Sequence, residues 1–128
     1  MRSIKHIIGI LAIFTFTSCV QETHLKTITF KVDMRSIENP TNVGIRGNFT
    51  DNPWNDTAPL TDENNDGIYE GTFSQKTAIN QIQFKFVNQL TDYELPDSDN
   101  RIITFEYKPE TIIYETTFNS FESKITKQ

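Results

Sequence analysis

The chain is 128 residues long, and its 17 acidic and 12 basic residues give a net charge of −5. This length fits a single domain, and the lack of any run of lysines and arginines excludes nucleic acid as a partner, because phosphate binding depends on clustered positive charge. One cysteine cannot form an intramolecular disulfide, and two histidines give neither a zinc-ligand spacing nor a Ser-His-Asp arrangement.

The N-terminal residues have the layout of a secretory signal. A basic start at Arg2 and Lys5 precedes an apolar run over residues 7–16, which is too short to span a bilayer as a mature helix. Small residues then lead to Cys19 in a junction that resembles the lipoprotein box of bacteria, in which the cysteine is acylated and becomes the new N-terminus. An uncleaved anchor and an ordinary secretory signal with a spare thiol are the alternatives.

The lipoprotein interpretation predicts a location and a set of boundaries. Residues 1–18 would be the signal peptide, lipid such as palmitate on Cys19 would be the attachment to the membrane, and residues 19–26 would be a polar tether. We expect the protein in the cell envelope of a Gram-negative bacterium, at the outer membrane. His24 falls in the tether on this interpretation, so we expect no positioned histidine in the folded domain.

From Thr27 onward the apolar residues alternate with polar ones, the pattern of strands that bury one face. The segment TITFKVDM, residues 27–34, places Ile28, Phe30, Val32 and Met34 on one side. We therefore expect an all-β fold: a single immunoglobulin-like antiparallel β-sandwich of about seven strands over residues 27–119, followed by a polar tail, 120–128, that frays. Five further segments carry the pattern: VGIRGNF, GIYEGTF, IQFKFVN, RIITFEY and TIIYETTF.

The stretch DENNDGIYEG, residues 62–71, begins like the calcium loop of an EF-hand. Position twelve of such a loop needs an acidic ligand, but here it is Phe73, and a strand rather than a helix is expected after Gly67. Acidic and amide side chains followed by glycine are also typical of a tight turn between strands. We expect the turn and no metal; an irregular calcium site would take its ligands from Asp62, Asn64, Asp66 and Glu70.

Several motifs occur in an order typical of one protein family. FKVDM, VGIRGNF, Trp54, PLTDENNDGIYEGTF, FKFVN and ELPDSDNR follow one another along the chain. Together they resemble the immunoglobulin-like starch- and glycogen-binding modules, such as the glycogen-binding domain of AMP-activated kinase β subunits and the N-terminal modules of α-glucan branching and debranching enzymes. The resemblance covers residues 27–117 and implies α-glucan binding without catalysis or a cofactor.

The resemblance also implies a set of sugar-contacting residues. Trp54 and Tyr93 would be the two aromatic platforms and Lys85 the lysine between them; Asn88 and Asn100 would lie at the same end. In the family the tryptophan usually follows the phenylalanine of the preceding strand by three positions, whereas Phe49 and Trp54 are five apart, and the second platform is usually a tryptophan.

The residues themselves support this site in part. Sugar rings present flat patches of C–H groups, so a glycan site needs an exposed aromatic face beside polar groups. Alternation in IQFKFVN turns Ile82, Phe84 and Phe86 inward and predicts that Lys85 stands in solvent, as a sugar contact or as an ordinary strand lysine. Trp54 is either an exposed platform or a plug at the end of the core.

Enzymatic functions are not supported by the sequence. The acidic residues crowd into turns, where carboxylates are normally solvated, and a small sandwich offers no deep cleft for paired carboxylates to act in. Two functions remain: a non-catalytic α-glucan-binding lipoprotein, and a structural or protein-interaction lipoprotein that keeps the sandwich without a sugar site.

Overall fold

The computed structural model describes residues 21–128, which form an all-β fold and contain no helix. The predicted β-sandwich class is therefore confirmed. Cys19 and the segment before it lie outside the described residues. Nine strands form in this range: β1 (His24–Asp33), β2 (Gly44–Gly47), β3 (Ala58–Pro59), β4 (Ile68–Thr77), β5 (Gln81–Asn88), β6 (Asp92–Tyr93), β7 (Arg101–Thr104), β8 (Glu110–Thr117) and β9 (Ser123–Lys127).

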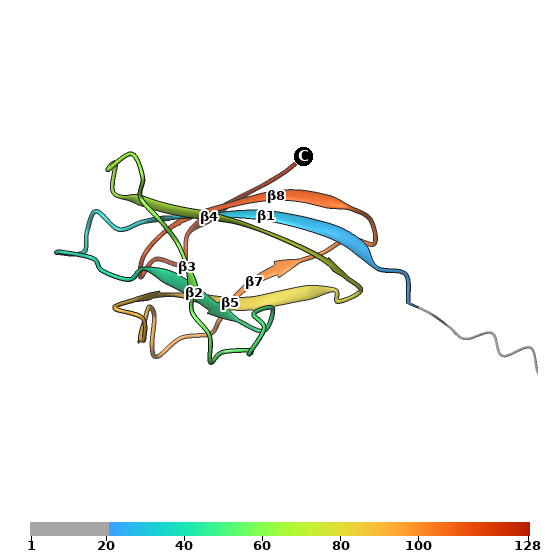
Figure 1. The fold of residues 1–128 in the computed structure, drawn as a ribbon, viewed down its shortest axis with the longest axis horizontal. Coiled ribbons are helices and arrows are strands. Elements are labelled where there is room, and N and C mark those ends of the chain that lie inside the picture. Colours follow the sequence, from blue (N-terminus) through green and yellow to red (C-terminus); the bar gives the residue numbers. More distant parts are fainter. Residues whose placement is uncertain (1–20) are drawn as a thin grey trace, which may run out of the picture.

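The strands make two sheets that pack face to face (Figure 1). One sheet has the order β4-β1-β8-β9, and the other has the order β3-β2-β5-β6, with β7 also paired to β5. We call them the first and the second sheet. Within residues 21–128 no helix is long and apolar enough to cross a membrane.

The core between the sheets comes from the alternation seen in the sequence. Ile28, Phe30 and Val32 of β1 are buried, as are Phe84 and Phe86 of β5 across the interface. The Phe30 ring lies at the centre, with its centroid 5.0 Å from that of Phe84 and 6.2 Å from that of Phe86 in edge-to-face geometry. Edge-to-face contacts add to the stability gained from burying the rings. The inward faces of these two strands were thus predicted correctly.

One pairing differs from the predicted antiparallel arrangement. β1 pairs antiparallel with β4, but on its other side it pairs parallel with β8, in register from Lys26 opposite Glu110 to Asp33 opposite Thr117. Period-two alternation states which face a residue occupies and contains no information on the direction of the neighbouring strand. The sandwich is therefore mixed at this one pair.

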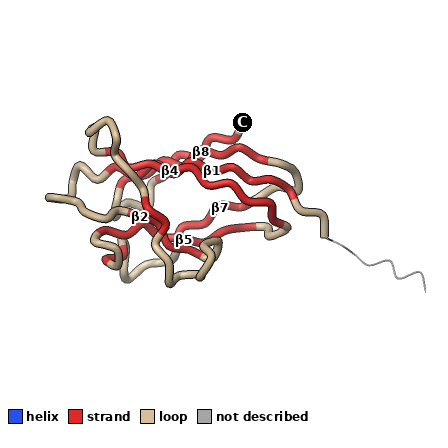
Figure 2. The backbone as a smooth tube through the Cα atoms, in the orientation of Figure 1, coloured by secondary structure: helices blue, strands red, loops and turns tan. Residues whose placement is uncertain are grey.

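Both predicted ends of the domain lie too far inward. β1 begins at His24 rather than after residue 26, and Lys26 is buried. The expected frayed tail contains β9, which pairs antiparallel with β8. Charged residues obscure the alternation at both ends, since Lys26 of β1 and Lys127 of β9 are paired with Glu110 in the fold. Loop backbone is concentrated at the end of the sandwich opposite the start of β1 (Figure 2).

Candidate functional site

The outer face of the second sheet carries two of the predicted platform residues. Arg46 of β2 lies directly opposite Lys85 of β5 in the antiparallel register, and Tyr93 of β6 lies opposite Val87. Two loops, residues 48–57 and 94–100, lie beside these strands. Trp54 belongs to the first of them, so the fold brings it to the same face.

Arg46 joins Trp54 to Tyr93. Its Nη1 donates to the carbonyl oxygen of Trp54 at 3.0 Å and to the hydroxyl of Tyr93 at 3.3 Å. The Tyr93 hydroxyl in turn donates to the Trp54 carbonyl at 3.2 Å, and the guanidinium lies 5.7 Å from the centroid of the Tyr93 ring. Trp54 and Tyr93 are both partly exposed. The two aromatic residues thus share one patch with a cation between them, which we call the aromatic patch: Arg46, Trp54 and Tyr93.

Arg46 was missed by the sequence analysis, although its signal was available. In VGIRGNF, Val43 and Ile45 are buried and Arg46 alternates with them. The rule that placed Lys85 on the outer face therefore also placed Arg46 there. The resemblance to glycan-binding modules implied Lys85, and not Arg46, as the cation between the two aromatic platforms.

The loop that carries Trp54 is held firmly to the sheet. The amide of Trp54 donates to the carbonyl of Gly47 at 3.0 Å, and Nε of Arg46 donates to the Thr57 hydroxyl at 2.7 Å. A Cβ on Gly47 would lie 2.5 Å from the carbonyl oxygen of Gln83, so only glycine allows this close approach of β2 to β5 at the point where the loop begins. A loop that is already fixed before binding loses less conformational freedom when a ligand stacks on it, which favours binding.

Trp54 has an unfavourable backbone conformation. Its φ is 64°, in the left-handed region that non-glycine residues rarely adopt and that carries an energetic cost. The side chain lies outside the hydrophobic cluster that the described residues form between the sheets. The interpretation of Trp54 as a plug of the core is therefore not supported, and the Trp54 main chain, through its carbonyl oxygen, is the part that Arg46 holds.

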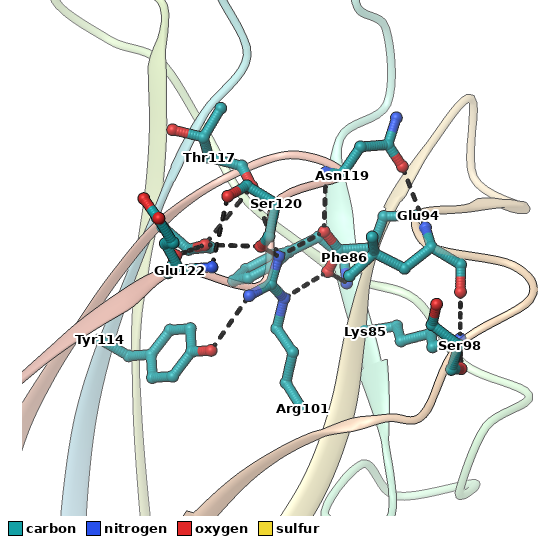
Figure 3. Close-up of polar contacts among 12 residues, drawn as sticks. Lys85, Phe86, Glu94, Ser98, Arg101, Tyr114, Thr117, Asn119, Ser120 and Glu122 are labelled. Carbon is teal, nitrogen blue, oxygen red and sulfur yellow. Dashed lines mark hydrogen bonds and ion pairs between the residues drawn. The ribbon is translucent and has the colours of Figure 1, made fainter.

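The prediction that Lys85 stands in solvent is wrong. Lys85 is only 7% exposed, and its ammonium group donates to the carbonyls of Leu95 and Ser98, each at 2.7 Å. The loop after β6 folds back over the outer face of β5, and the ammonium group of Lys85 holds this loop by its carbonyls (Figure 3). Alternation correctly assigned the face of the sheet, but it could not show that a loop covers that face.

The two predicted asparagines also have structural partners. Asn88 is buried, and its Oδ1 accepts a hydrogen bond from the amide of Thr41 at 3.0 Å. Asn100 is partly exposed, and its Nδ2 donates to Oε1 of Gln83 at 3.3 Å. Of the five predicted sugar contacts, the structure therefore groups Trp54 and Tyr93, leaves Asn100 accessible at a distance along the sheet, and buries Lys85 and Asn88.

A buried ion pair fixes the segment that follows Tyr93. Glu94 and Arg101 are buried, and they form two hydrogen bonds of 2.7 Å each (Figure 3). Glu94 also accepts from the amides of Phe86 and Asn119, so it links the second sheet to the loop after β8. Burial alone would lower the pKa of Arg101, but the hydrogen bonds and charge of Glu94 outweigh it and raise that pKa. Arg101 therefore stays charged, and the segment that follows Tyr93 is attached to a rigid support.

A cleft adjoins the aromatic patch at the open edge between the sheets. Its volume is about 820 Å³, and Arg46 lines it together with polar residues of the 48–57 loop. Its apolar lining residues include Phe49, Phe73 and Ile82. Polar groups at a rim beside exposed aromatic residues are the combination that a glycan site requires. The polar rim residues from this loop are Thr50, Asp51, Asn55, Asp56 and Thr57.

The acidic stretch at residues 62–67 forms a turn whose side chains bind its own backbone. The Asp62 carboxylate accepts from the amides of Asp66 and Gly67 at 3.1 and 2.9 Å, and Asp66 accepts from the amide of Ile68 at 2.9 Å. The bond from Ile68 contributes most to the lowered pKa of Asp66. Gly67 has φ 84°, as the turn requires. Within residues 21–128 no three acidic, histidine or cysteine side chains come together as metal ligands.

A second buried charged cluster lies at the start of β1. The ammonium of Lys26 donates to the Glu110 carboxylate at 2.7 Å and to the carbonyl of Glu106 at 2.7 Å, and Lys127 of β9 lies 2.9 Å from the other Glu110 oxygen. Burial would raise the pKa of Glu110, but these two lysines lower it to about 2. The sequence analysis assigned Lys26 to the tether and Lys127 to the tail because charged residues are usually exposed, whereas both pair with Glu110 in the fold.

Two solution structures are among the solved structures that are similar to this chain. No protein family profile and no curated protein matches the chain. CBM25-2 of the beta/alpha-amylase from Paenibacillus polymyxa has a TM-score of 0.49 at 13% identity, over 82% of this chain and 94% of that one. CBM25-1 of the same enzyme has a TM-score of 0.47 at 16% identity, over 81% and 93%. At these values the likeness assigns neither a family nor a ligand to this chain.

Proposed function

We propose that this protein is a non-catalytic carbohydrate-binding protein that takes α-glucans on the aromatic patch. The observation that carries the proposal is the grouping of Trp54 and Tyr93 around Arg46 on one face. Two partly exposed aromatic side chains offer stacking surfaces for sugar rings, and the guanidinium and the cleft rim offer donors and acceptors for hydroxyls. The motif order in the sequence supports α-glucan as the class of glycan.

The proposal includes a lipid anchor at Cys19 and a place in the envelope of a Gram-negative bacterium, at the outer membrane. The basic start, the apolar run and the small residues before the only cysteine support it. A site of this kind is shallow and wet, so each copy binds weakly, with a dissociation constant on the order of tens of micromolar to millimolar. Many anchored copies on one surface would compensate through avidity.

The anchor has its own test. The Cys19→Ser protein should leave the membrane fraction, and the wild type should have the mass of a lipidated chain that begins at residue 19. A wild type that keeps the unprocessed mass would contradict the anchor and leave glycan binding untouched.

Gel retardation in amylopectin, glycogen and an unrelated polysaccharide tests glycan binding, with residues 22–128 as the sample because they carry all nine strands. Trp54→Ala should abolish retardation by the α-glucans, since an aromatic platform supplies about 1 to 3 kcal/mol of binding. Its thermal stability should stay near that of the wild type, because Trp54 lies outside the core cluster of the described residues. Tyr107→Ala is the matched control: Tyr107 is exposed, lies far from the patch, and should leave retardation unchanged.

The second candidate is a structural or protein-interaction lipoprotein without a sugar site. The burial of Lys85 and Asn88, two residues that the family resemblance implies as sugar contacts, favours it. The gel separates the two functions. If the folded wild-type protein migrates through every α-glucan gel without retardation, only the structural or protein-interaction function remains.

A further inference from the structure

Exposed apolar side chains gather at the end of the sandwich where β1 starts. Leu25 is 45% exposed, Ile79 44% and Tyr107 68%. Ile79 lies in the connection from β4 to β5 and Tyr107 in the connection from β7 to β8, and both connections lie at this end (Figure 1). The two loops are joined by a hydrogen bond from the amide of Phe105 to the carbonyl of Asn80 at 2.8 Å. Tyr107 is held in place by edge-to-face contact with His24, centroid to centroid 4.5 Å.

Two exposed lysines accompany these side chains. Lys76 lies opposite Leu25 in the pairing of β1 with β4, and the side chain of Lys108 is 63% exposed beside Tyr107. We call this set the proximal surface: Leu25, Lys76, Ile79, Tyr107 and Lys108. Of the carboxylates at this end, Glu106 pairs with Lys108 at 3.2 Å and Glu110 pairs with Lys26 and Lys127, while Glu22, two positions before β1, is exposed.

The opposite end of the molecule is acidic. The turn with Asp62, Glu63 and Asp66 lies beyond the last residue of β1, where the amide of Met34 donates to the carbonyl of Gly67. The ten residues of β1 separate the two ends, which corresponds to about 33 Å at the usual rise of a strand. An anionic surface would therefore attract the proximal surface and repel the far end.

The chain itself enters the domain at the proximal surface. Cys19 precedes the first residue of β1 by five positions, and five residues span at most about 18 Å when fully extended. A lipid on Cys19 would therefore hold this end within reach of the headgroups. Tyrosine is enriched where a protein meets the lipid interface, and lysine keeps its stem in apolar surroundings while its ammonium group reaches the phosphates.

We propose that the proximal surface lies in the headgroup layer of the membrane, so that the anchored domain stands on this end with the long axis of β1 directed away from the bilayer. The partner is a phospholipid surface, and the contact comes from Leu25, Ile79 and Tyr107 with Lys76 and Lys108 around them. The inference rests on the lipid anchor of the proposed function and adds an orientation to it. In this orientation the aromatic patch, on the outer face of the second sheet, opens sideways rather than toward the lipid.

Trp54 is the only tryptophan of the chain, so fluorescence can report on one chosen position. The lipidated protein, which begins at Cys19, is prepared with Trp54→Phe and Tyr107→Trp and reconstituted into vesicles of phosphatidylethanolamine and phosphatidylglycerol with brominated acyl chains. Emission from position 107 should shift to the blue and be quenched relative to the same vesicles without bromine. The matched control carries Trp54→Phe and Glu63→Trp, which places the reporter in the far turn, and it should be neither shifted nor quenched.

Each result decides the question. Quenching at position 107 and none at position 63 supports the orientation. Equal quenching at both positions, or quenching at neither while mass spectrometry shows lipid on Cys19, overturns the orientation and leaves the anchor intact. Absence of lipid on Cys19 overturns both the anchor and the orientation, and glycan retardation by residues 22–128 remains a separate measurement.

Discussion

At the scale of single residues, charged side chains explain most of the differences between the predicted and the observed site. Alternation in IQFKFVN correctly predicted that Phe84 and Phe86 face the core. It could not predict the burial of Lys85, because the group that covers Lys85 is the backbone of a loop ten to thirteen residues further on. A local pattern reports the face of a strand and contains no information on distant loops.

Replacing Lys85 should therefore affect stability more than sugar contact. Lys85→Met removes two charge-assisted hydrogen bonds to the carbonyls of Leu95 and Ser98, and we expect the free energy of unfolding to fall by about 1.5 to 3 kcal/mol. Urea denaturation measures the change. Lys76→Met is the control, because Lys76 is exposed and should change stability by less than about 0.5 kcal/mol. Equal stability of the two variants would contradict the supporting role of Lys85.

The charge on Glu110 predicts a loss of stability in acid. Its pKa in the folded protein is about 2, against an ordinary value of 4.5, so the ionised form favours the folded state. This contribution, of about 3 kcal/mol, is fully present above about pH 4.5 and is lost as the pH falls toward 2. Unfolding free energies across this range should fall less steeply for Glu110→Gln than for the wild type. Glu122→Gln, at an exposed position, should follow the wild-type slope.

At the scale of elements, strand positions were predicted well and the terminal strands were not. The six segments with clear alternation all contain strands, because each turns apolar residues toward the core, fully buried in five of them and partly buried in β4. β9, with the sequence SKITK, buries little, and it is held by pairing to β8 and by the contact of Lys127 with Glu110 and the carbonyl of Thr104. Such a strand depends on partners that lie elsewhere in the sequence, so its own residues do not reveal it.

Removal of β9 tests whether it is part of the domain. Deleting residues 122–128 strips the outer edge of β8 of its antiparallel partner and leaves Glu110 with one lysine instead of two. We expect a lower melting temperature in differential scanning calorimetry. Lys127→Met isolates the charge contribution, and it should cost less than the deletion. A deletion variant with the wild-type melting temperature would show that residues 122–128 behave as the expected tail.

At the scale of the whole molecule, the sandwich has two ends with different chemistry and one face with the candidate site. The sequence predicted the fold class and the two aromatic residues of the aromatic patch. It did not predict that Arg46 joins them, or that the buried pair of Glu94 and Arg101 anchors the segment after Tyr93. Arg46 reaches Tyr93 across the second sheet, 47 positions further along the chain, and the contacts to Trp54 and between Glu94 and Arg101 involve irregular loops, which period-two alternation does not describe.

The parallel pairing of β1 with β8 has a consequence for the order of folding. Lys26 and Glu110, which begin this pairing, are 84 residues apart in the chain. Sheets dominated by such distant contacts fold slowly, because the entropy of closing a long loop is lost before any contact is gained. β1 is central in its sheet, so until β8 has been synthesised one of its edges has no partner. The domain therefore completes its fold only after the C-terminal strands have left the ribosome, and an N-terminal fragment would expose an open edge that invites aggregation.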